Sequence, residues 1–371
     1  MKILHAYKDF DPPIRGGMER HIALMCRYQR EWAEVEVLSC SRNFRTRRVV
    51  RNTIDVTEVG EWGRFQSAPL APTYPIHLRT HAADVRVLHF PNPTAEIGYL
   101  LTRPPGALVV RYHSDVVRQA AAMAVYRPLL MKFLAKADII LPTSEQYLNT
   151  SKTLEPFRNK CRVVPLGIVA EDFETPRAER VQELREQYGG RYVLFTGRHR
   201  YYKGLDYLVK AALEIRARVV IAGEGPETHN LQTLARDLGA EVAFPGELSD
   251  DDLVDHLHGC EVFVFPSIER SEAFGVSILE AQACGKPVIA TTLGTGVEYA
   301  NLHETTGLNV PPRDSAGLAQ AVNELLKDDE RRERLGAQAI ERIRRDFSAR
   351  NVAKAEFDLY QEAIECSKAG T

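Results

Sequence analysis

The sequence lacks several features that would mark specialised classes of protein. No run approaches the ~18 uncharged apolar residues that a membrane-spanning helix needs. The first residues turn polar too soon for a signal peptide, so we expect neither a leader nor a membrane anchor. Six cysteines are scattered without a close pair, which argues against a zinc site or a disulfide framework and favours a reducing, cytoplasmic compartment. No internal repeat or low-complexity segment occurs.

The overall composition is that of an ordinary globular protein, but the charge is distributed unevenly along the chain. The 371 residues, 44% hydrophobic and 26% charged, are enough for about two domains. Residues 1–165 hold 24 Lys and Arg against 15 Asp and Glu, a balance of +9, whereas the rest carries −11. The basic half therefore predicts contact with an anionic partner. Nucleic acid is disfavoured, because no basic motif interleaved with aromatic residues appears.

Short apolar runs alternate with amphipathic stretches in both halves, which predicts an α/β protein with two parallel sheets. We expect strands at 2–6, 35–39, 85–90, 108–112, 138–142, 192–196, 218–222, 241–244, 261–265 and 287–290. We expect helices near 204–216, 227–238, 250–258, 274–284, 315–327 and 330–346. A hinge at 163–168, before a polar stretch, predicts domains at 1–167 and 168–348, with a last helix at 349–366 returning to the first domain.

Three motifs carry chemical information, and the first is a glycine pair after the first strand. Gly16 and Gly17 stand where a strand-to-helix turn is expected, so backbone N–H groups there could face an anion. No G-x-G-x-x-G follows this strand, which argues against a dinucleotide site of that type. A simple tight turn is the alternative.

The second motif follows the first strand of the second half. Arg198 and Lys203 stand on a loop at a strand's carboxyl end, where open α/β sheets bind ligands. Two cations there could neutralise a diphosphate. The alternative is a solvated basic loop. If Lys203 binds the ligand, a Lys203→Ala variant is expected to lose turnover with little change in melting temperature.

The third motif is the most specific. Glu272 lies on a loop after a strand, and a helix is expected to begin near Phe274 and to end at Gly285. Its first N–H groups, near Phe274, Gly275, Val276 and Ser277, would point to the mouth of the sheet. We expect Glu280, one turn further along, on the buried side, where a carboxylate needs partners.

Together these motifs resemble the retaining glycosyltransferases of family 4, which have the GT-B fold: two facing Rossmann-like domains with parallel sheets and a cleft between them. The resemblance spans nearly the whole chain and is strongest over 192–312. It includes the E-x7-E spacing of Glu272 and Glu280, Gly197-Arg198 with Lys203-Gly204, and the glycine pair. Within the family, the chain is most similar to rhamnosyl- and mannosyltransferases.

The resemblance implies a role for each motif residue. Arg198 and Lys203 would stabilise the leaving nucleotide diphosphate, with a backbone N–H from the Gly16–Gly17 turn. Glu280 would hold the ribose hydroxyls, and Glu272 the transferred sugar. His113, after a strand of the first domain, would lie near donor sugar and acceptor. The remaining donor-binding positions would be the helix start and the base-facing loops: Phe274, Gly275, Val276, Ser277, Gly246, Leu248 and Gly223.

The implied enzyme needs no metal or other cofactor, because the cation pair and the helix start would replace a metal. No Asp-x-Asp follows a strand of the first domain, and residues 250–252 are expected to open a helix. The resemblance implies a donor such as GDP-mannose or GDP-rhamnose, with UDP-hexoses next, and a glycan or lipid-linked acceptor. A small-molecule acceptor, and a non-catalytic module that binds nucleotide or polyanion, are the alternatives.

Two segments could contact an anionic membrane at the inner face of the cell. Residues 42–51 hold five arginines, and an exposed loop or hairpin with solvated charge is the favoured interpretation over a lipid-binding patch. Residues 126–136 mix apolar and basic side chains, and a core-packing helix is favoured over an interfacial one.

Overall fold

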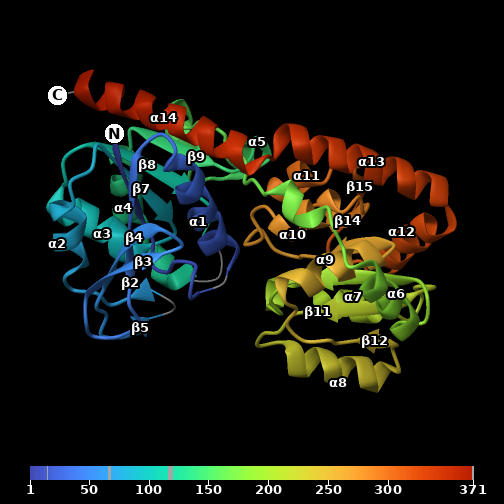
Figure 1. Ribbon diagram of the computed structural model, residues 1–371. Coiled ribbons are helices and arrows are strands. Elements are labelled where there is room, and N and C mark those ends of the chain that lie inside the picture. The colour runs from blue at the N-terminus through green and yellow to red at the C-terminus, as the bar shows by residue number, and fades with distance from the viewer. Residues whose placement is uncertain (15, 66–67, 116–119, 370–371) are drawn as a thin grey trace. The chain divides into compact units, whose positions relative to one another are not determined.

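The computed structural model describes residues 1–14, 16–65, 68–115 and 120–369, which form two compact units (Figure 1). The first unit comprises Met1–Gly167 and Ala349–Thr371, and the second comprises Ile168–Ser348. Each unit is a mainly parallel sheet flanked by helices, so the expected α/β class is confirmed.

The sheet of the first unit has seven strands in the order β3-β4-β2-β1-β7-β8-β9. Their bounds are β1 Lys2–Ala6, β2 Glu34–Cys40, β3 Arg47–Arg51, β4 Ile54–Val59, β7 Val85–Phe90, β8 Ala107–Tyr112 and β9 Ile139–Pro142. All pairs are parallel except β3 with β4. Strands β7 and β8 are buried along their whole length, as their continuous apolar runs predict.

The arginine-rich segment forms the edge of this sheet. Strand β3 pairs with β4 in an antiparallel hairpin, in which Arg47 and Arg51 contact Glu58. The segment thus forms a hairpin, one of the two expected arrangements, although neither β3 nor β4 was predicted as a strand. Its arginines are partly paired with Glu58, and contact with lipid stays a prediction. A separate two-stranded ribbon, β5 (Arg64–Phe65) with β6 (Ala68–Pro69), follows it.

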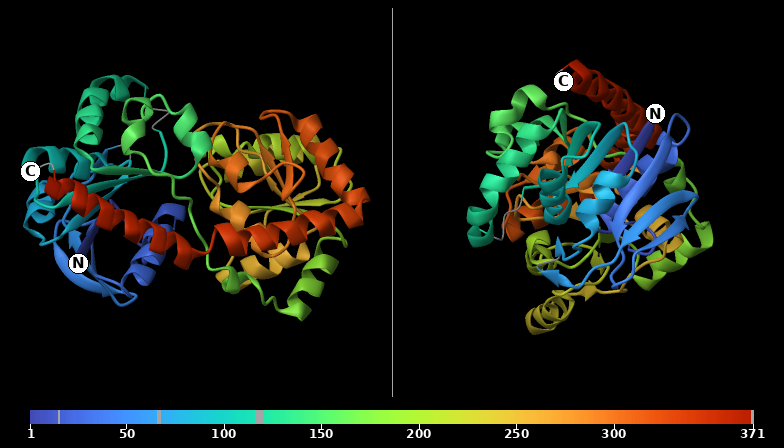
Figure 2. Two further views of the ribbon diagram at one scale, coloured as in Figure 1. Left: turned by 90° about the horizontal axis from the view of Figure 1, so that it is seen from above. Right: turned by 90° about the vertical axis from the view of Figure 1, so that its left-hand side faces the viewer.

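Helices cover the first sheet on both faces. They are α1 Gly17–Gln29, α2 Tyr74–Thr80, α3 Pro93–Thr102, α4 Ala120–Lys136, α5 Glu145–Thr150 and α14 Ala349–Ala369, with the short 3-10 helix η1 Glu155–Lys160. Helix α14 packs on α1 and on strands β7 and β8 (Figures 1 and 2), so the last helix does return to the first unit. In a second layer, helix α3 contacts both α2 and α4.

The second unit holds a six-stranded parallel sheet in the order β12-β11-β10-β13-β14-β15. The strands are β10 Tyr192–Thr196, β11 Arg218–Ala222, β12 Val242–Ala243, β13 Val262–Phe265, β14 Val288–Thr291 and β15 Gly307–Val310. Its helices are η2 Ala170–Phe173, α6 Ala178–Gln187, η3 Tyr201–Lys203, α7 Leu205–Ala211, α8 Thr228–Leu238, α9 Asp250–Gly259, α10 Val276–Ala283, α11 Gly296–Ala300, α12 Ser315–Lys327 and α13 Asp329–Asp346.

Some elements of this unit were not predicted, and the end of one predicted helix was placed too late. The polar stretch after the hinge contains α6, which packs on α9. Helix α7 ends at Ala211 and is followed by a turn. At the far end of that turn, Asn323 of α12 accepts from the Arg216 N–H and donates to the Glu214 carbonyl. Strand β15 was not predicted.

Among the described residues, no helix is long and apolar enough to cross a membrane. Six cysteines carry free thiols, and only Cys366 is exposed.

Candidate functional site

The strand order of the second sheet creates a switch point between β10 and β13. The chain runs outward from β10 to β11 and β12, then returns to β13 on the other side of β10. Ligands of open α/β sheets bind outside the carboxyl ends of strands at such a point. Lys203 follows β10 and Glu272 follows β13, so the two predicted residues stand on opposite sides of it.

Lys203 and Glu272 are in direct contact. Lys203 Nζ lies 2.5 Å from Glu272 Oε2, with only 12% and 11% of the two side chains exposed. Ser267 donates a second hydrogen bond to the same carboxylate oxygen at 3.1 Å, and the Phe265 ring centroid lies 4.5 Å from Nζ. The sequence predicted both residues at a ligand site, but it did not predict this pair or the role of Ser267.

The loop that carries Lys203 is held by close backbone packing. Gly204 has φ +62°, and a Cβ there would come within 2.2 Å of the Pro266 carbonyl oxygen, so only glycine fits. The Ile268 N–H donates to the Tyr202 carbonyl at 2.8 Å, which ties this loop to the one after β13. Lys203 is thereby held at a defined position beside the sheet.

Arg198, the second predicted cation, and the loops predicted to face the base lie at the ends of neighbouring strands. Arg198 is exposed, one residue beyond Gly197, whose N–H donates to the Ala222 carbonyl. The Gly223 N–H donates to the Gly246 carbonyl at 2.7 Å, so the turns after β11 and β12 are joined. Gly223, Gly246 and Leu248 are half-buried.

Helix α10 begins two residues later than expected. Phe274 is buried outside the helix, Gly275 is its N-cap with φ +90°, and the helix starts at Val276. A Cβ on Gly275 would approach the Phe265 ring to 2.9 Å, so this cap also requires glycine. The N–H groups of Val276 and Ser277 belong to the open first turn.

The expectation that Glu280 lies on the buried side was wrong. Glu280 is half-buried, as is Val276 one turn before it, whereas Leu279 and Ala283 face the core. A half-buried carboxylate can reach both solvent and a ligand, so its position one turn along α10 still permits the predicted contact.

The glycine pair of the first unit opens helix α1. Gly16 is the N-cap with extended backbone, and Gly17 is the exposed first residue of the helix. The predicted strand-to-helix turn is therefore present, and a Cβ on Gly17 would meet nothing within 4 Å. Anion binding there stays a prediction. Arg15, the residue before it, lies outside the described residues.

His113 directly follows β8 and is 4% exposed. Its Nε2 lies 3.0 Å from His89 Nδ1, and its ring stacks on the His89 ring. Burial lowers the pKa of His113 well below its ordinary value, so the ring is neutral near pH 7. Sequence reasoning missed His89 and His5, although each stands near the carboxyl end of a predicted strand.

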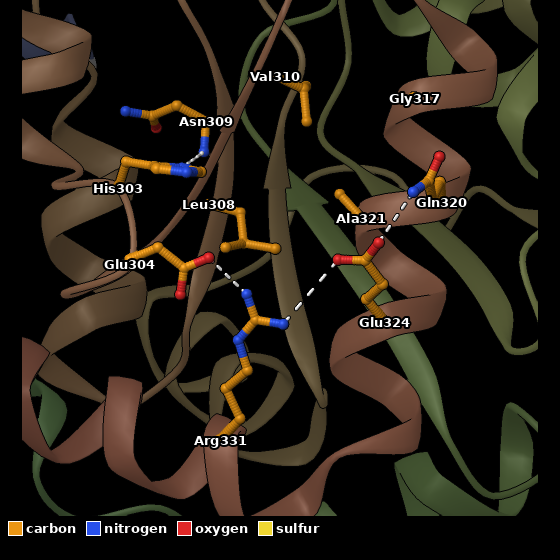
Figure 3. A pocket seen from close by; sticks show the side chains of 10 residues that line it. All are labelled: His303, Glu304, Leu308, Asn309, Val310, Gly317, Gln320, Ala321, Glu324 and Arg331. Carbon is orange, nitrogen blue, oxygen red and sulfur yellow. Dashed lines mark hydrogen bonds and ion pairs between the residues drawn. The ribbon is translucent and has the colours of Figure 1, made fainter.

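A hollow elsewhere in the second unit holds none of the predicted residues. It lies between β15 and helices α12 and α13 (Figure 3). Arg331 extends into it and contacts Glu304 at 2.6 Å and Glu324 at 3.9 Å. The arginine charge is thus balanced by its own neighbours.

Family models match the two units of the chain separately. Residues 15–172 match the model "Glycosyltransferase Family 4", and residues 176–342 match "Glycosyl transferases group 1". The chain is 34% identical to O-antigen chain mannosyltransferase C of Escherichia coli, over 98% of this chain and 99% of that protein. It is 36% identical to D-rhamnosyltransferase WbpZ of Pseudomonas aeruginosa, over 94% of this chain and 93% of the other.

Solved structures match the fold over the whole chain. Sucrose-phosphate synthase from Thermosynechococcus elongatus superimposes with a TM-score of 0.83 at 21% identity, over 97% of this chain and 98% of that one. WaaG, a glycosyltransferase involved in lipopolysaccharide biosynthesis, gives a TM-score of 0.70 at 15% identity, over 96% and 99%. The expected GT-B fold of two Rossmann-like units with parallel sheets is confirmed.

Proposed function

The chain belongs to glycosyltransferase family 4, in the mannosyl- and rhamnosyltransferase-like subgroup, and on this premise we propose that it transfers mannose or rhamnose from a GDP-sugar to a hydroxyl of a growing glycan. The names of the two full-length relatives support the sugar class, and the name of the mannosyltransferase also supports an O-antigen type of acceptor. UDP-hexoses are the second choice of donor.

The observation that carries the proposal is the buried Lys203–Glu272 pair at the switch point of the second sheet. An ammonium group beside a carboxylate suits a ligand with both a phosphate and hydroxyls. Lys203 would attract the diphosphate as the glycosidic bond breaks, and Glu272 would accept hydrogen bonds from the sugar. Charge stabilisation of a leaving group by prearranged cations is often the largest catalytic contribution.

Two further groups of the second unit would complete the donor site. Arg198, exposed at the same strand end, would offer a planar fork to the diphosphate. The open N–H groups of Val276 and Ser277 would bind phosphate or sugar oxygens, with Phe274 and Gly275 shaping the turn. Glu280 would hold the ribose, and Gly223, Gly246 and Leu248 would border the base.

In the first unit, the Gly17 N–H would add a donor to the diphosphate, and His113 would contact a substrate hydroxyl. We propose that this unit binds the acceptor. The reaction would retain the anomeric configuration, with the acceptor attacking from the side of the leaving diphosphate. The diphosphate oxygen itself would help to remove the proton of the acceptor hydroxyl.

The reaction is proposed to need no metal ion, because Lys203, Arg198 and the start of α10 already supply positive charge to the diphosphate. Full transfer activity in excess chelator is the expected result. Loss of activity in chelator, restored by added magnesium, would overturn this part of the proposal.

We further propose that the first unit contacts an anionic membrane at the cytoplasmic face, where a lipid-linked glycan would be extended. The supporting surface, which we call the arginine–aromatic patch, surrounds the loops that precede β3 and β5. Phe44 and Trp62 are 77% and 71% exposed there, and Phe65 and Leu70 are also exposed. The Glu61 N–H donates to the Asn43 carbonyl, so the two loops are adjacent.

The patch also carries the arginines of the 42–51 segment, and aromatic side chains with arginine are suited to an anionic bilayer surface. Vesicles of phosphatidylglycerol should shift the Trp62 fluorescence to shorter wavelength, whereas phosphatidylcholine vesicles should not. A Trp62→Ala variant should lose this response. An unchanged spectrum with both lipids would remove the membrane contact.

The donor is tested by a thermal-shift screen of GDP-, UDP- and dTDP-sugars, since a tight ligand raises the melting temperature by mass action. Transfer is then measured with the best donor and a lipid-linked or free saccharide acceptor. Lys203→Ala and Glu272→Ala should abolish transfer, whereas Lys210→Ala, an exposed lysine on α7, should not. A donor that binds without any transfer or hydrolysis would favour the non-catalytic alternative.

A further inference from the structure

Three histidines form a hydrogen-bonded row across the first sheet, from β1 through β7 to the end of β8. His5 Nδ1 lies 3.0 Å from His89 Nε2, and His89 Nδ1 lies 3.0 Å from His113 Nε2. Both ring pairs are stacked, with centroids 5.3 Å apart. None of the three side chains is more than 4% exposed, so water does not compete for these bonds.

The row continues into helices α1 and α14. His5 Nε2 lies 2.8 Å from the Gln29 Oε1 atom. The amide nitrogen of Gln29 faces Glu356 Oε2 and Tyr360 Oη, each at 3.4 Å, and Tyr360 donates to the same carboxylate oxygen at 2.8 Å. Arg111 Nε lies 3.0 Å from the other oxygen of Glu356.

Glu356 is ionised. Burial alone would raise the pKa of this carboxyl, but the charge of Arg111 and the contacts with His21 and Tyr360 together outweigh burial and lower the pKa to about 2. Burial lowers the pKa of His5 to about 4 and the pKa values of His89 and His113 well below the ordinary value. The row therefore consists of neutral rings that end on a carboxylate.

The charge of Glu356 sets the direction of every hydrogen bond in the row. A carboxylate only accepts, so the NH2 group of Gln29 faces it and the Gln29 carbonyl faces His5. His5 must then donate through Nε2, which leaves its Nδ1 as an acceptor. His89 consequently donates through Nε2 to His5 and accepts at Nδ1, so His113 donates through Nε2.

We propose that Glu356, acting through Gln29, His5 and His89, holds His113 in the Nε2–H tautomer and presents its bare Nδ1 to a substrate hydroxyl. This Nδ1 atom is buried and has no hydrogen-bond partner within the part of the chain that the structure describes. The inference rests on the proposed role of His113 in sugar transfer. The other four are positioning residues, which act only through the His113 ring.

The chemical consequence is a fixed hydrogen-bond polarity at the carboxyl end of β8. With Nδ1 bare, a hydroxyl of the transferred sugar donates to His113, and the oxygen lone pairs of that hydroxyl point elsewhere. The attacking acceptor hydroxyl keeps its proton for the diphosphate oxygen. In the opposite tautomer Nδ1–H would donate to the sugar hydroxyl and occupy one of its lone pairs.

The tautomer is measured directly by two-bond ¹H–¹⁵N correlation of the full chain labelled with ¹⁵N-histidine. Bare and protonated ring nitrogens resonate at well-separated frequencies, and the His113 signals are assigned by their absence in His113→Gln. The expected spectrum shows a bare Nδ1 and a protonated Nε2. A protonated Nδ1, or an even mixture of tautomers, would overturn the proposal whatever the activity of the enzyme.

The functional role is tested with two variants of His89. His89→Phe keeps the ring and removes both hydrogen bonds, and it should lower kcat about tenfold with an unchanged KM for the donor, since one hydrogen bond is lost at His113. In His89→Gln the amide carbonyl can accept from His113 while its NH2 donates to His5. This variant should retain at least a third of the wild-type kcat.

A matched control is His81→Phe, which removes a buried histidine that bonds to Thr57 in the same unit but lies outside the row. It should leave kcat unchanged. If His113→Leu abolishes turnover while His89→Phe stays within twofold of wild type, the row has no function although the proposed function stands. If His113→Leu is itself fully active, His113 has no role in transfer and the functional part of the inference falls with it.

Discussion

Replacing Lys203 by alanine should impair both catalysis and stability, because the side chain is the partner of a buried carboxylate. Lys203 Nζ and Glu272 Oε2 lie 2.5 Å apart, and almost nine-tenths of each side chain is removed from water. Removing one partner of a buried ion pair costs about 3–5 kcal/mol, because the other charge remains without compensation. This contradicts the expectation from sequence that the variant would keep its melting temperature.

The Ser267 hydrogen bond to Glu272 remains in the variant and offsets part of this loss. We therefore expect a destabilisation of about 2–3 kcal/mol. For a unit of 150–250 residues this lowers the melting temperature by roughly 4–12 °C. Thermal unfolding followed by circular dichroism measures the shift, and release of nucleotide from the donor measures turnover, which should fall at least tenfold.

Two variants separate the contributions. Lys210→Ala breaks only an exposed pair with Asp206 on α7 and should change stability by less than about 0.5 kcal/mol. The double variant Lys203→Met with Glu272→Gln removes both charges and should recover most of the stability without recovering turnover. A Lys203→Ala protein that melts within about 1 °C of wild type would refute the buried-pair reasoning.

Three further outcomes are expected. Burial raises the pKa of Glu96 to about 7, above its unfolded value, so stability should decrease by about 3 kcal/mol between pH 4.5 and 7, and Glu96→Gln should abolish this slope in pH-dependent denaturation. Burial lowers the pKa of His5 to about 4, so the stabilisation by the neutral ring is present above pH 6.5 and is lost as pH falls towards 4. The melting temperature of His5→Gln, measured between pH 6.5 and 4, should therefore fall less with decreasing pH than that of the wild type. Gly204→Ala, which would drive a Cβ against the Pro266 carbonyl, should cost about 3 kcal/mol by urea titration, and a loss under 1 kcal/mol would contradict the observed contact.

Local sequence patterns predicted most of the strands because parallel strands buried on both faces are continuous apolar runs. Tyr192–Thr196 and Val85–Phe90 have the bounds that their apolar runs indicate. Strand β3 was not predicted, because its arginines lie at a sheet edge where no apolar run is needed. Helix α7 was predicted too long, because the residues after Ala211 form a turn whose far end bonds to the distant helix α12, which the local pattern does not reveal.

The candidate residues were predicted from motif spacing, but their partners were not. Spacing indicated Lys203 and Glu272 as ligand-binding residues of separate loops, and their roles there stay predictions. That the two side chains meet depends on β10 and β13 being neighbours in the sheet. Glu280 was expected on the buried side because of its apolar neighbours Val276, Leu279 and Ala283. In the structure Leu279 and Ala283 are buried, whereas Glu280 and Val276 lie on a half-buried side of α10.

What the sequence determined by itself is the α/β alternation, the division into two units and the family, because these follow from residues close together in the chain. Only the tertiary structure decided which charged and polar groups share one environment. His5, His89, His113 and Glu356 are separated by up to hundreds of residues, and they meet because parallel pairing aligns β1, β7 and β8 while α14 packs against them. Burial then makes their hydrogen bonds strong and directional, since water is absent, and no property of the separate segments contains that information.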